Sequence, residues 1–152
     1  MNEKTTTPDH FAEKVKPANI TGLLIDVYHE TARVVTVPRE RHSFEVLLCG
    51  NELDIVTRRV GGHRRGRGKK ARYFDIVCDD NALGHKSPKI SAVDDLGQTM
   101  LVGNLFIVSR TPDGLTVSLT PEDQEYLQNY VMLQATRKHP RPYPMLQHCE
   151  YA

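Results

Sequence analysis

Tryptophan is absent from this sequence, and cysteine is scarce. Only three cysteines occur among 152 residues, at Cys49, Cys78 and Cys149. They are odd in number and far apart, and no CxxC or Cys/His ligand spacing surrounds them. Few, widely separated cysteines in odd number do not indicate a disulfide framework, and a structural zinc site would need the missing ligand spacing, so we expect reduced thiols and no metal site.

Long apolar runs are also missing. No stretch approaches the roughly 20 apolar residues that a membrane-spanning helix requires. The N-terminal sequence MNEKTTTPDHFAEKVKP has no apolar core of the kind found in secretory signals. We therefore expect a soluble protein of the cytoplasm that makes no contact with membranes.

The motifs that mark common enzyme classes are absent too. The sequence has no GxxxxGKS or GxxxxGKT loop, no GxSxG elbow, no HExxH, and no GxGxxG that follows a strand and opens a helix. Its seven histidines are scattered. Because no nucleophile, base and orienting group can be named together, we predict a protein without catalytic residues and without a cofactor. An enzyme with an unrecognised site is the alternative.

Two pairs of neighbouring carboxylates are the remaining candidates for chemistry. Asp79 and Asp80 precede Asn81 at the end of an apolar run, and Asp94 and Asp95 stand in a similar setting. Two such carboxylates could hold Mg²⁺ if a third ligand came from elsewhere. Asp and Asn side chains also bond to nearby backbone in turns, and we favour turns at both places.

Charge of one sign is concentrated in a single segment. The formal net charge is only +1, but residues 58–72 contain eight Lys or Arg and no Asp or Glu. That leaves 12 basic against 19 acidic side chains elsewhere, so the segment carries +8 and the remainder −7. A ligand within about a Debye length, roughly 8 Å at physiological salt, responds to this local charge and not to the total.

The composition of this basic segment suits phosphate groups. Arg presents a rigid two-pronged donor, Gly lets the backbone approach a ligand, and flexible cations release counterions from a polyanion. We predict that nucleic acid or a nucleotide binds here through Arg58, Arg59, Arg64, Arg65, Arg67, Lys69, Lys70 and Arg72. A merely solvated loop, or contact with an acidic protein surface, would also account for the charge.

Apolar patterns predict strands and one helix in the first half of the chain. ITGLLIDVY and ARVVTV, separated by HET, indicate a hairpin over residues 20–37. Phe44, Leu47 and Leu48 lie at helical spacing before a glycine, which predicts a helix over 41–49. NELDIVTRRV and RYFDIVCDD should form a second hairpin, with GGHRRGRGKK as a long connection that is mobile without a partner.

The second half contains a strand pattern and a well-marked helix start. MLVGNLFIVSR is predicted to be one strand, and PDG at 112–114 a turn into LTVSL. Thr120 is expected to cap a helix that has Pro121 at its first position and continues through Gln134. RKHPRPYPMLQHCEYA follows, and its closely spaced prolines cannot continue that helix.

These elements predict an α+β fold in one domain, because 152 residues are too few for two domains of typical size. We expect a mostly antiparallel sheet of about six strands, covered on one face by two helices. Residues 1–18 should form a flexible leader, and residues 19–136 the domain, with its basic loop at 61–72. Residues 137–152 are expected to be a Pro-rich tail.

Four motifs together resemble a known family. NELDIVTRRVGG, YFDIVCDDNAL, SAVDDLGQTMLVGNLFIV and SLTPEDQEYL are similar to the family called domain of unknown function 3846, over about residues 20–134. Members usually join the first two motifs by a short connection, whereas this chain carries HRRGRGKKAR between them. No role for the basic loop therefore follows from the resemblance.

The resemblance implies the kind of genetic element that encodes the protein, but it implies no catalytic activity. Members of that family occur in bacterial phages, plasmids and conjugative elements, and no catalytic residues are established for them. Similar modules stand beside antirestriction modules, so the resemblance implies a noncatalytic accessory protein that counters defence in the cytoplasm of a bacterial host cell. Together with the basic segment, this predicts binding of nucleic acid or a nucleotide signal. Inhibition of a host defence protein by direct contact is the alternative.

Overall fold

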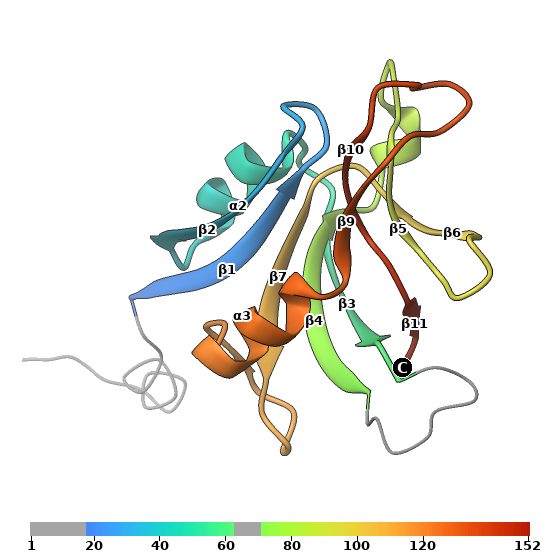
Figure 1. Cartoon of the computed structure of the whole chain (residues 1–152). Helices are drawn as coiled ribbons and strands as arrows, with labels where there is room; N and C mark the ends of the chain where they lie inside the picture. The colour runs from blue at the N-terminus through green and yellow to red at the C-terminus, as the bar shows by residue number, and fades with distance from the viewer. Residues whose placement is uncertain (1–17, 63–70) are drawn as a thin grey trace, which may run out of the picture.

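The computed structural model describes residues 18–62 and 71–152 (Figure 1). Within these residues the chain forms eleven strands, two α-helices and one short 3₁₀ helix, η1 (Ala82–Gly84). The strands belong to two sheets, and all their pairings but one are antiparallel in the part of the chain described. The predicted α+β class and the single domain are confirmed, although the strands outnumber the six that we expected.

The larger sheet contains seven of these strands. They are β1 (Asn19–Asp26), β2 (Thr31–Pro38), β3 (Leu53–Val60), β4 (Arg72–Asp79), β7 (Leu105–Arg110), β8 (Thr116–Val117) and β11 (Cys149–Tyr151). Their order is β11-β3-β4-β7-β1-β2, with β8 added beside β7. Both predicted hairpins are confirmed, because β1 pairs with β2 and β3 with β4 along their full lengths.

The smaller sheet has four strands and packs on one face of the larger one. They are β5 (Ile90–Val93), β6 (Thr99–Val102), β9 (Val131–Gln134) and β10 (Tyr143–Leu146), in the order β6-β5-β10-β9. The pair of β10 with β5 is parallel. Phe74 and Ile107 of the larger sheet share one buried cluster with Tyr143 and Leu146 of the smaller sheet. The main core therefore lies between the two sheets.

The helices lie on opposite faces of the larger sheet, not on one face as we expected. Side chains alternate along β7, so Ile107 belongs to the core between the sheets and Phe106 to a second cluster on the other face. Helix α2 (Arg41–Leu48) covers that second cluster with Leu48, which confirms the predicted helix. Helix α3 (Pro121–Gln128) instead contributes Leu127 to the core between the sheets.

The run MLVGNLFIVSR forms two strands in different sheets, so the prediction of one strand was wrong. The break falls at Gly103, which has a φ of 84°, and at Asn104, which is buried. The Asn104 side chain accepts a hydrogen bond from the Val27 N–H at 2.9 Å and donates one to the Leu47 carbonyl at 3.0 Å. These bonds hold a sharp change of direction between β6 and β7.

The predicted start of α3 is confirmed, but its predicted length is wrong. The Thr120 hydroxyl accepts a hydrogen bond from the Asp123 N–H at 3.1 Å, and Pro121 follows the cap. The helix ends at Gln128, and Val131–Gln134 forms β9. Four residues of β9 pair with β10, the next strand in the chain, so backbone hydrogen bonding between strands overrides the helical spacing.

The stretch that we expected to be a Pro-rich tail contributes two strands. All four residues of β10 are buried, and the Tyr143 hydroxyl donates a hydrogen bond to the Ile90 carbonyl at 2.8 Å. Strand β11 then pairs with β3 at the edge of the larger sheet. The prolines exclude a helix here, but they are compatible with extended backbone. The fold therefore extends to Tyr151.

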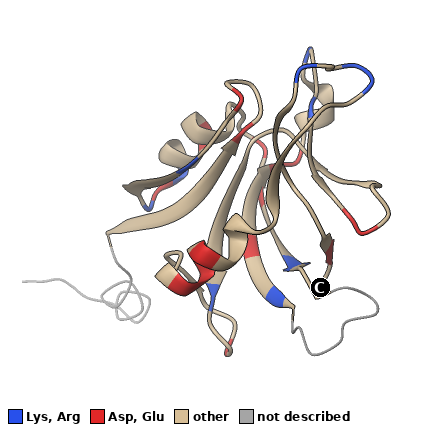
Figure 2. Cartoon of the chain, viewed as in Figure 1, with Lys and Arg blue, Asp and Glu red and all other residues tan. Residues whose placement is uncertain are grey.

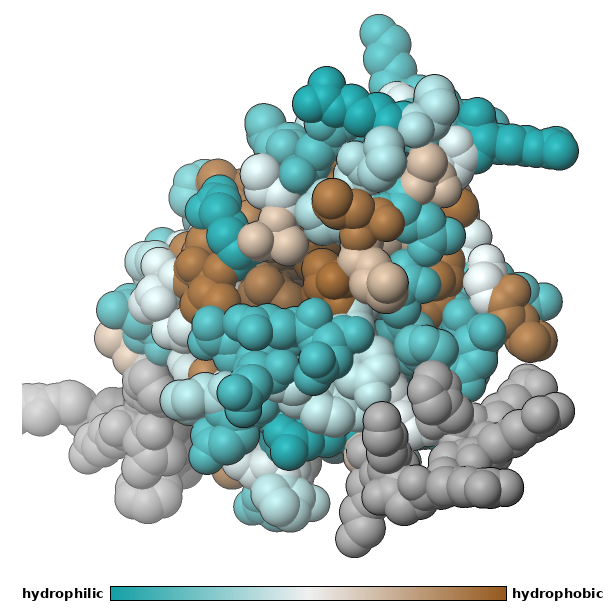
Figure 3. Space-filling model, viewed as in Figure 1, coloured by the Kyte–Doolittle hydropathy of each residue, from teal (hydrophilic) through white to brown (hydrophobic). Residues whose placement is uncertain are grey.

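A groove of about 390 Å³ opens beside α3, between the edge strands of the two sheets. Leu23, Val34 and Val131 are among the residues that line it. β2 and β9, on its two sides, are the terminal strands of their sheets. The side chains of Met132 and Leu133 on β9 are 58% and 71% exposed. Figure 3 shows apolar side chains gathered on this side of the molecule.

The three cysteines carry free thiols in different surroundings. Burial raises the pKa of the Cys78 thiol to about 11 and that of the Cys149 thiol to about 12. Partial desolvation of its sulfur also raises the pKa of the Cys49 thiol, but the residue as a whole is exposed to solvent. Buried thiols with raised pKa values remain protonated near neutral pH and react slowly.

We therefore expect an aromatic disulfide reagent at pH 8 to label Cys49 in the native protein and to label Cys78 and Cys149 only after denaturation. Absorbance of the released thiolate measures the number of labelled thiols. A Cys49→Ser variant serves as the control and should show no fast labelling. Fast labelling of that variant would contradict the burial of the other two thiols.

Candidate phosphate-binding surface

The hairpin of β3 and β4 positions both ends of the basic segment. Arg58 and Arg59 lie near the end of β3, and Arg72 begins β4 opposite Val60, as predicted. The other predicted phosphate-binding residues lie outside the described residues; they are Arg64, Arg65, Arg67, Lys69 and Lys70.

Two glycines follow directly after the end of β3. Gly61 and Gly62 have φ values of 80° and 62°, a region that side chains disfavour. The Gly61 N–H donates a hydrogen bond to the His148 carbonyl at 3.0 Å. A Cβ on Gly62 would lie 2.7 Å from the Cβ of Ala71. The chain after β3 and the chain before β4 therefore approach each other so closely that position 62 has no room for a side chain.

Arg72 is engaged by helix α3. Its guanidinium lies 2.9 Å from the Asp123 carboxylate and stacks over the Tyr126 ring, 4.7 Å from the centroid. Tyr126 in turn donates a hydrogen bond to the Val60 carbonyl at 2.7 Å. Burial, and then a hydrogen bond with Tyr130, raises the pKa of Tyr126 to about 12, so its hydroxyl keeps the donated proton. Arg72 thus joins β4 to α3.

Arg58 lies on the same face of the sheet as Arg72 and also has protein partners. It is opposite Phe74 in β4 and opposite Tyr151 in β11. Its guanidinium stacks over the Tyr151 ring at 4.9 Å and donates a hydrogen bond to the Thr57 carbonyl at 3.2 Å. Since these contacts occupy Arg58, its role is at least partly structural.

Arg59 faces the other side of the sheet. It pairs with Tyr73, and the two-residue period of a strand places both on the face that carries Asp75. Arg110 of β7 reaches the same face, where it contacts Asp75. The Tyr73 side chain is 51% exposed. Figure 2 shows basic residues at the neighbouring ends of β3, β4 and β7.

A buried carboxylate supports this open face. Asp75 is 1% exposed and accepts a hydrogen bond from the Thr57 hydroxyl at 2.8 Å and one from the Thr116 hydroxyl. Arg110 contacts its two oxygens at 3.2 and 3.4 Å. The buried charge is therefore paired and hydrogen-bonded, as burial of a carboxylate requires. This network orients Arg110, whose side chain is still 36% exposed.

The open face combines features that bind nucleotides and single strands. An exposed ring on a flat sheet offers a surface on which a base can stack, and nearby guanidinium groups can contact phosphates. Within the described part of the chain, no carboxylate lies within 4.0 Å of the charged atoms of Arg59. Sequence reasoning named Arg59 but missed Tyr73 and Arg110. The alternation in RYFDIV, which separates Tyr73 and Asp75 from Phe74 and Ile76, was the available signal.

Both pairs of neighbouring carboxylates stand where a strand passes into a turn, as predicted. The Asn81 N–H donates a hydrogen bond to the Asp79 side chain at 3.0 Å. The Leu96 and Gln98 N–H groups both donate to the Asp94 side chain, at 2.9 and 2.8 Å. Among the residues described, no three His, Cys, Asp or Glu side chains are grouped so that they could hold a metal ion.

Comparisons with known proteins found no relative. No protein-family model matches this chain. No curated protein and no solved structure matches it significantly. None of the helices in the described residues has the length and apolar character needed to cross a membrane. The functional argument therefore depends on the site itself.

Proposed function

We propose that this chain is a noncatalytic accessory protein of a phage or another mobile element, which binds a phosphate-bearing ligand in the cytoplasm of a bacterial host. The ligand is a nucleic acid or a nucleotide signal, and its capture counters a host defence. The mobile-element setting is supported by the resemblance of four sequence motifs, and the ligand class by the chemistry of the basic segment and of the adjacent sheet face.

The observation that carries the proposal is the position of Arg59, Tyr73 and Arg110 on one open face beside the basic segment. Phosphate contacts alone would bind any polyanion. An exposed aromatic ring adds stacking with a base, which an inorganic polyanion lacks. Together they favour a ligand that has both a base and a phosphate.

We expect Tyr73→Ala to weaken binding of fluorescent single-stranded DNA and RNA by roughly 5- to 150-fold, because one stacked base contributes about 1–3 kcal/mol. Arg59→Ser should weaken the same binding and reduce its dependence on salt, because one phosphate contact is lost. Fluorescence anisotropy at several salt concentrations measures both effects, and competition with a panel of mono- and dinucleotides tests whether a nucleotide suffices.

The matched controls are Tyr151→Ala and Arg33→Ser. Tyr151 is an exposed tyrosine on the opposite face, and Arg33 is an exposed arginine on the distant strand β2. Neither should change binding by more than twofold. Equal losses in controls and test variants would refute binding at this face. Hydrolysis of a bound nucleotide, abolished by Asp80→Ala, would refute the noncatalytic function.

Inhibition of a host defence protein by direct contact is a second candidate. The groove between the edge strands β2 and β9 favours it, since both strands end their sheets and the side chains of Met132 and Leu133 are exposed. A protein captured from host lysate by the wild type, but not by Leu133→Asp, would support this function. Such capture should not depend on Tyr73.

A further inference from the structure

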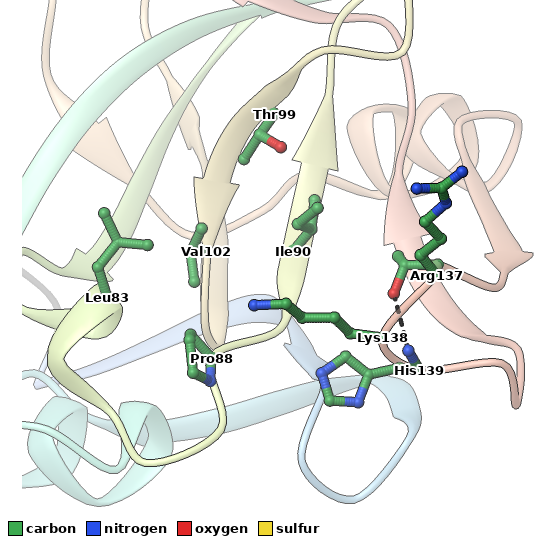
Figure 4. Close-up of a pocket in the computed structure, with 9 residues that line it drawn as sticks. Leu83, Pro88, Ile90, Thr99, Val102, Arg137, Lys138 and His139 are labelled. Atoms are coloured by element: carbon green, nitrogen blue, oxygen red, sulfur yellow. Dashed lines mark hydrogen bonds between the residues drawn. The ribbon is translucent and has the colours of Figure 1, made fainter.

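A second pocket lies away from the open face of Arg59 and Tyr73. It has a volume of about 360 Å³ and is lined by η1, by the segment before β5, by β5 and β6, and by the connection between β9 and β10. Volumes of roughly 300–1,000 Å³ are typical of sites for small molecules. Figure 4 shows the side chains that line this pocket.

The inner surface of the pocket is apolar. Leu83, Pro88, Ile90 and Val102 line it, and the Leu83 side chain is 77% exposed although it is a large apolar group. Removing apolar surface from water is favourable by about 25 cal/mol per Å², so an apolar group that covers this lining would gain binding free energy. The lining therefore favours a ligand with an apolar ring or chain.

A tight turn places basic side chains at the mouth of this pocket. The Thr136 N–H donates a hydrogen bond to the His139 carbonyl at 2.9 Å, and the His139 N–H donates one to the Thr136 hydroxyl at 3.1 Å. The His139 ring packs edge-on against the buried ring of Tyr143, with centroids 6.4 Å apart. The turn is thus anchored to the core, which fixes the backbone that carries Arg137 and Lys138.

The cations around this pocket differ in their partners. Two of them form ion pairs with the Glu30 carboxylate, which lies 3.0 Å from Arg141 Nε and 3.9 Å from Lys89 Nζ. In the described ranges, no carboxylate lies within 4.0 Å of the charged atoms of Arg137 or Lys138. Figure 4 shows the Lys138 side chain extending toward Pro88 and Val102 across the pocket, whereas Arg137 points away from it.

We propose that this pocket binds a small anion with an apolar body, and that Lys138 pairs with its acidic group. The apolar lining would hold the ring or chain, and an unpaired ammonium at the mouth would contact a carboxylate, sulfonate or phosphate. The proposal is independent of the function assigned to the open face near Tyr73, because the two sites share no residue.

The test uses 8-anilinonaphthalene-1-sulfonate, an aromatic anion, and its uncharged analogue N-phenyl-1-naphthylamine. Fluorescence titration of the folded full-length chain should show saturable binding of the anion at one site. Lys138→Gln should raise its dissociation constant at least fivefold and leave the uncharged analogue nearly unaffected. Leu83→Asp should weaken both probes, because it alters the apolar lining.

Lys86→Gln is the matched control, since Lys86 is an exposed lysine of the neighbouring segment that does not line the pocket. It should bind both probes as the wild type does. Circular dichroism melting checks that each variant is folded. Unchanged affinity for the anion in Lys138→Gln, or an equal loss in Lys86→Gln, would overturn the proposal.

Discussion

Replacing Arg64, Arg65, Arg67, Lys69 and Lys70 together by Ser should remove most of the binding to nucleic acid and leave the melting temperature nearly unchanged. The five side chains account for most of the +8 charge of residues 58–72. Surface substitutions away from packed or hydrogen-bonded features change stability by no more than about 0.5 kcal/mol. Anisotropy titrations and thermal melting of the same preparations measure the two effects.

The salt dependence of the wild type should be steep. On duplex DNA each neutralised phosphate contributes about −0.9 to the slope of log affinity against log salt, and on single strands about −0.7. Several contacts by the basic segment would therefore give a slope of several units, which the five-fold variant should lose. A single nucleotide as the ligand would give a shallow slope, so the slope also distinguishes the two ligand classes.

A second variant serves as the control for charge alone. It replaces four exposed cations elsewhere, at Arg33, Lys86, Arg137 and Lys138. If long-range attraction to the whole protein dominated, this variant would lose nearly as much affinity as the five-fold one. We expect it to retain most of the binding. If the five-fold variant binds every polyanion and nucleotide as tightly as the wild type, the basic segment is only a solvated connection.

Asp75→Ala should lower the free energy of unfolding by about 3 kcal/mol, because it leaves buried hydrogen-bonding groups and a cation without their partner. Asp75 is 1% exposed and contacts Thr57, Thr116 and Arg110. The Arg110 side chain is 36% exposed, so water compensates part of the loss and keeps the expected cost at the lower end for a buried pair. Urea denaturation measures the change.

Asp80→Ala is the matched control, since Asp80 is an exposed carboxylate in the turn after β4. It should change the free energy of unfolding by less than about 0.5 kcal/mol. Asp75→Asn, which retains one acceptor, should fall between the two. An Asp75→Ala protein as stable as the wild type would mean that the network contributes nothing to folding, and its role in holding Arg110 would have to be abandoned.

Local sequence signals predicted the elements whose partners are close in the chain. The hairpin of β1 and β2 needs only alternating apolar residues and a short polar connection. The start of α3 needs only Thr120 and Pro121, whose effects act within one turn. The charge of residues 58–72 is likewise a property of composition, and the hairpin placed Arg58, Arg59 and Arg72 at its base. In each case the deciding interaction spans few residues.

Tertiary structure decided what depends on distant partners. The break before β7 depends on Asn104, which bonds to Val27 and Leu47 far away in the chain. Helical spacing at Val131 was misleading for another reason: β9 pairs with the next strand, β10, which holds its place in the smaller sheet by parallel pairing with β5. The same holds for the open face. Local alternation separates Arg59 from Arg58, but only tertiary packing determines what covers each face. The smaller sheet and α3 cover the face of Arg58, whereas α2 covers the cluster around Phe106 on the other face and leaves Tyr73 exposed. A pattern of period two defines two faces of a strand, and burial against segments far along the chain selects between them.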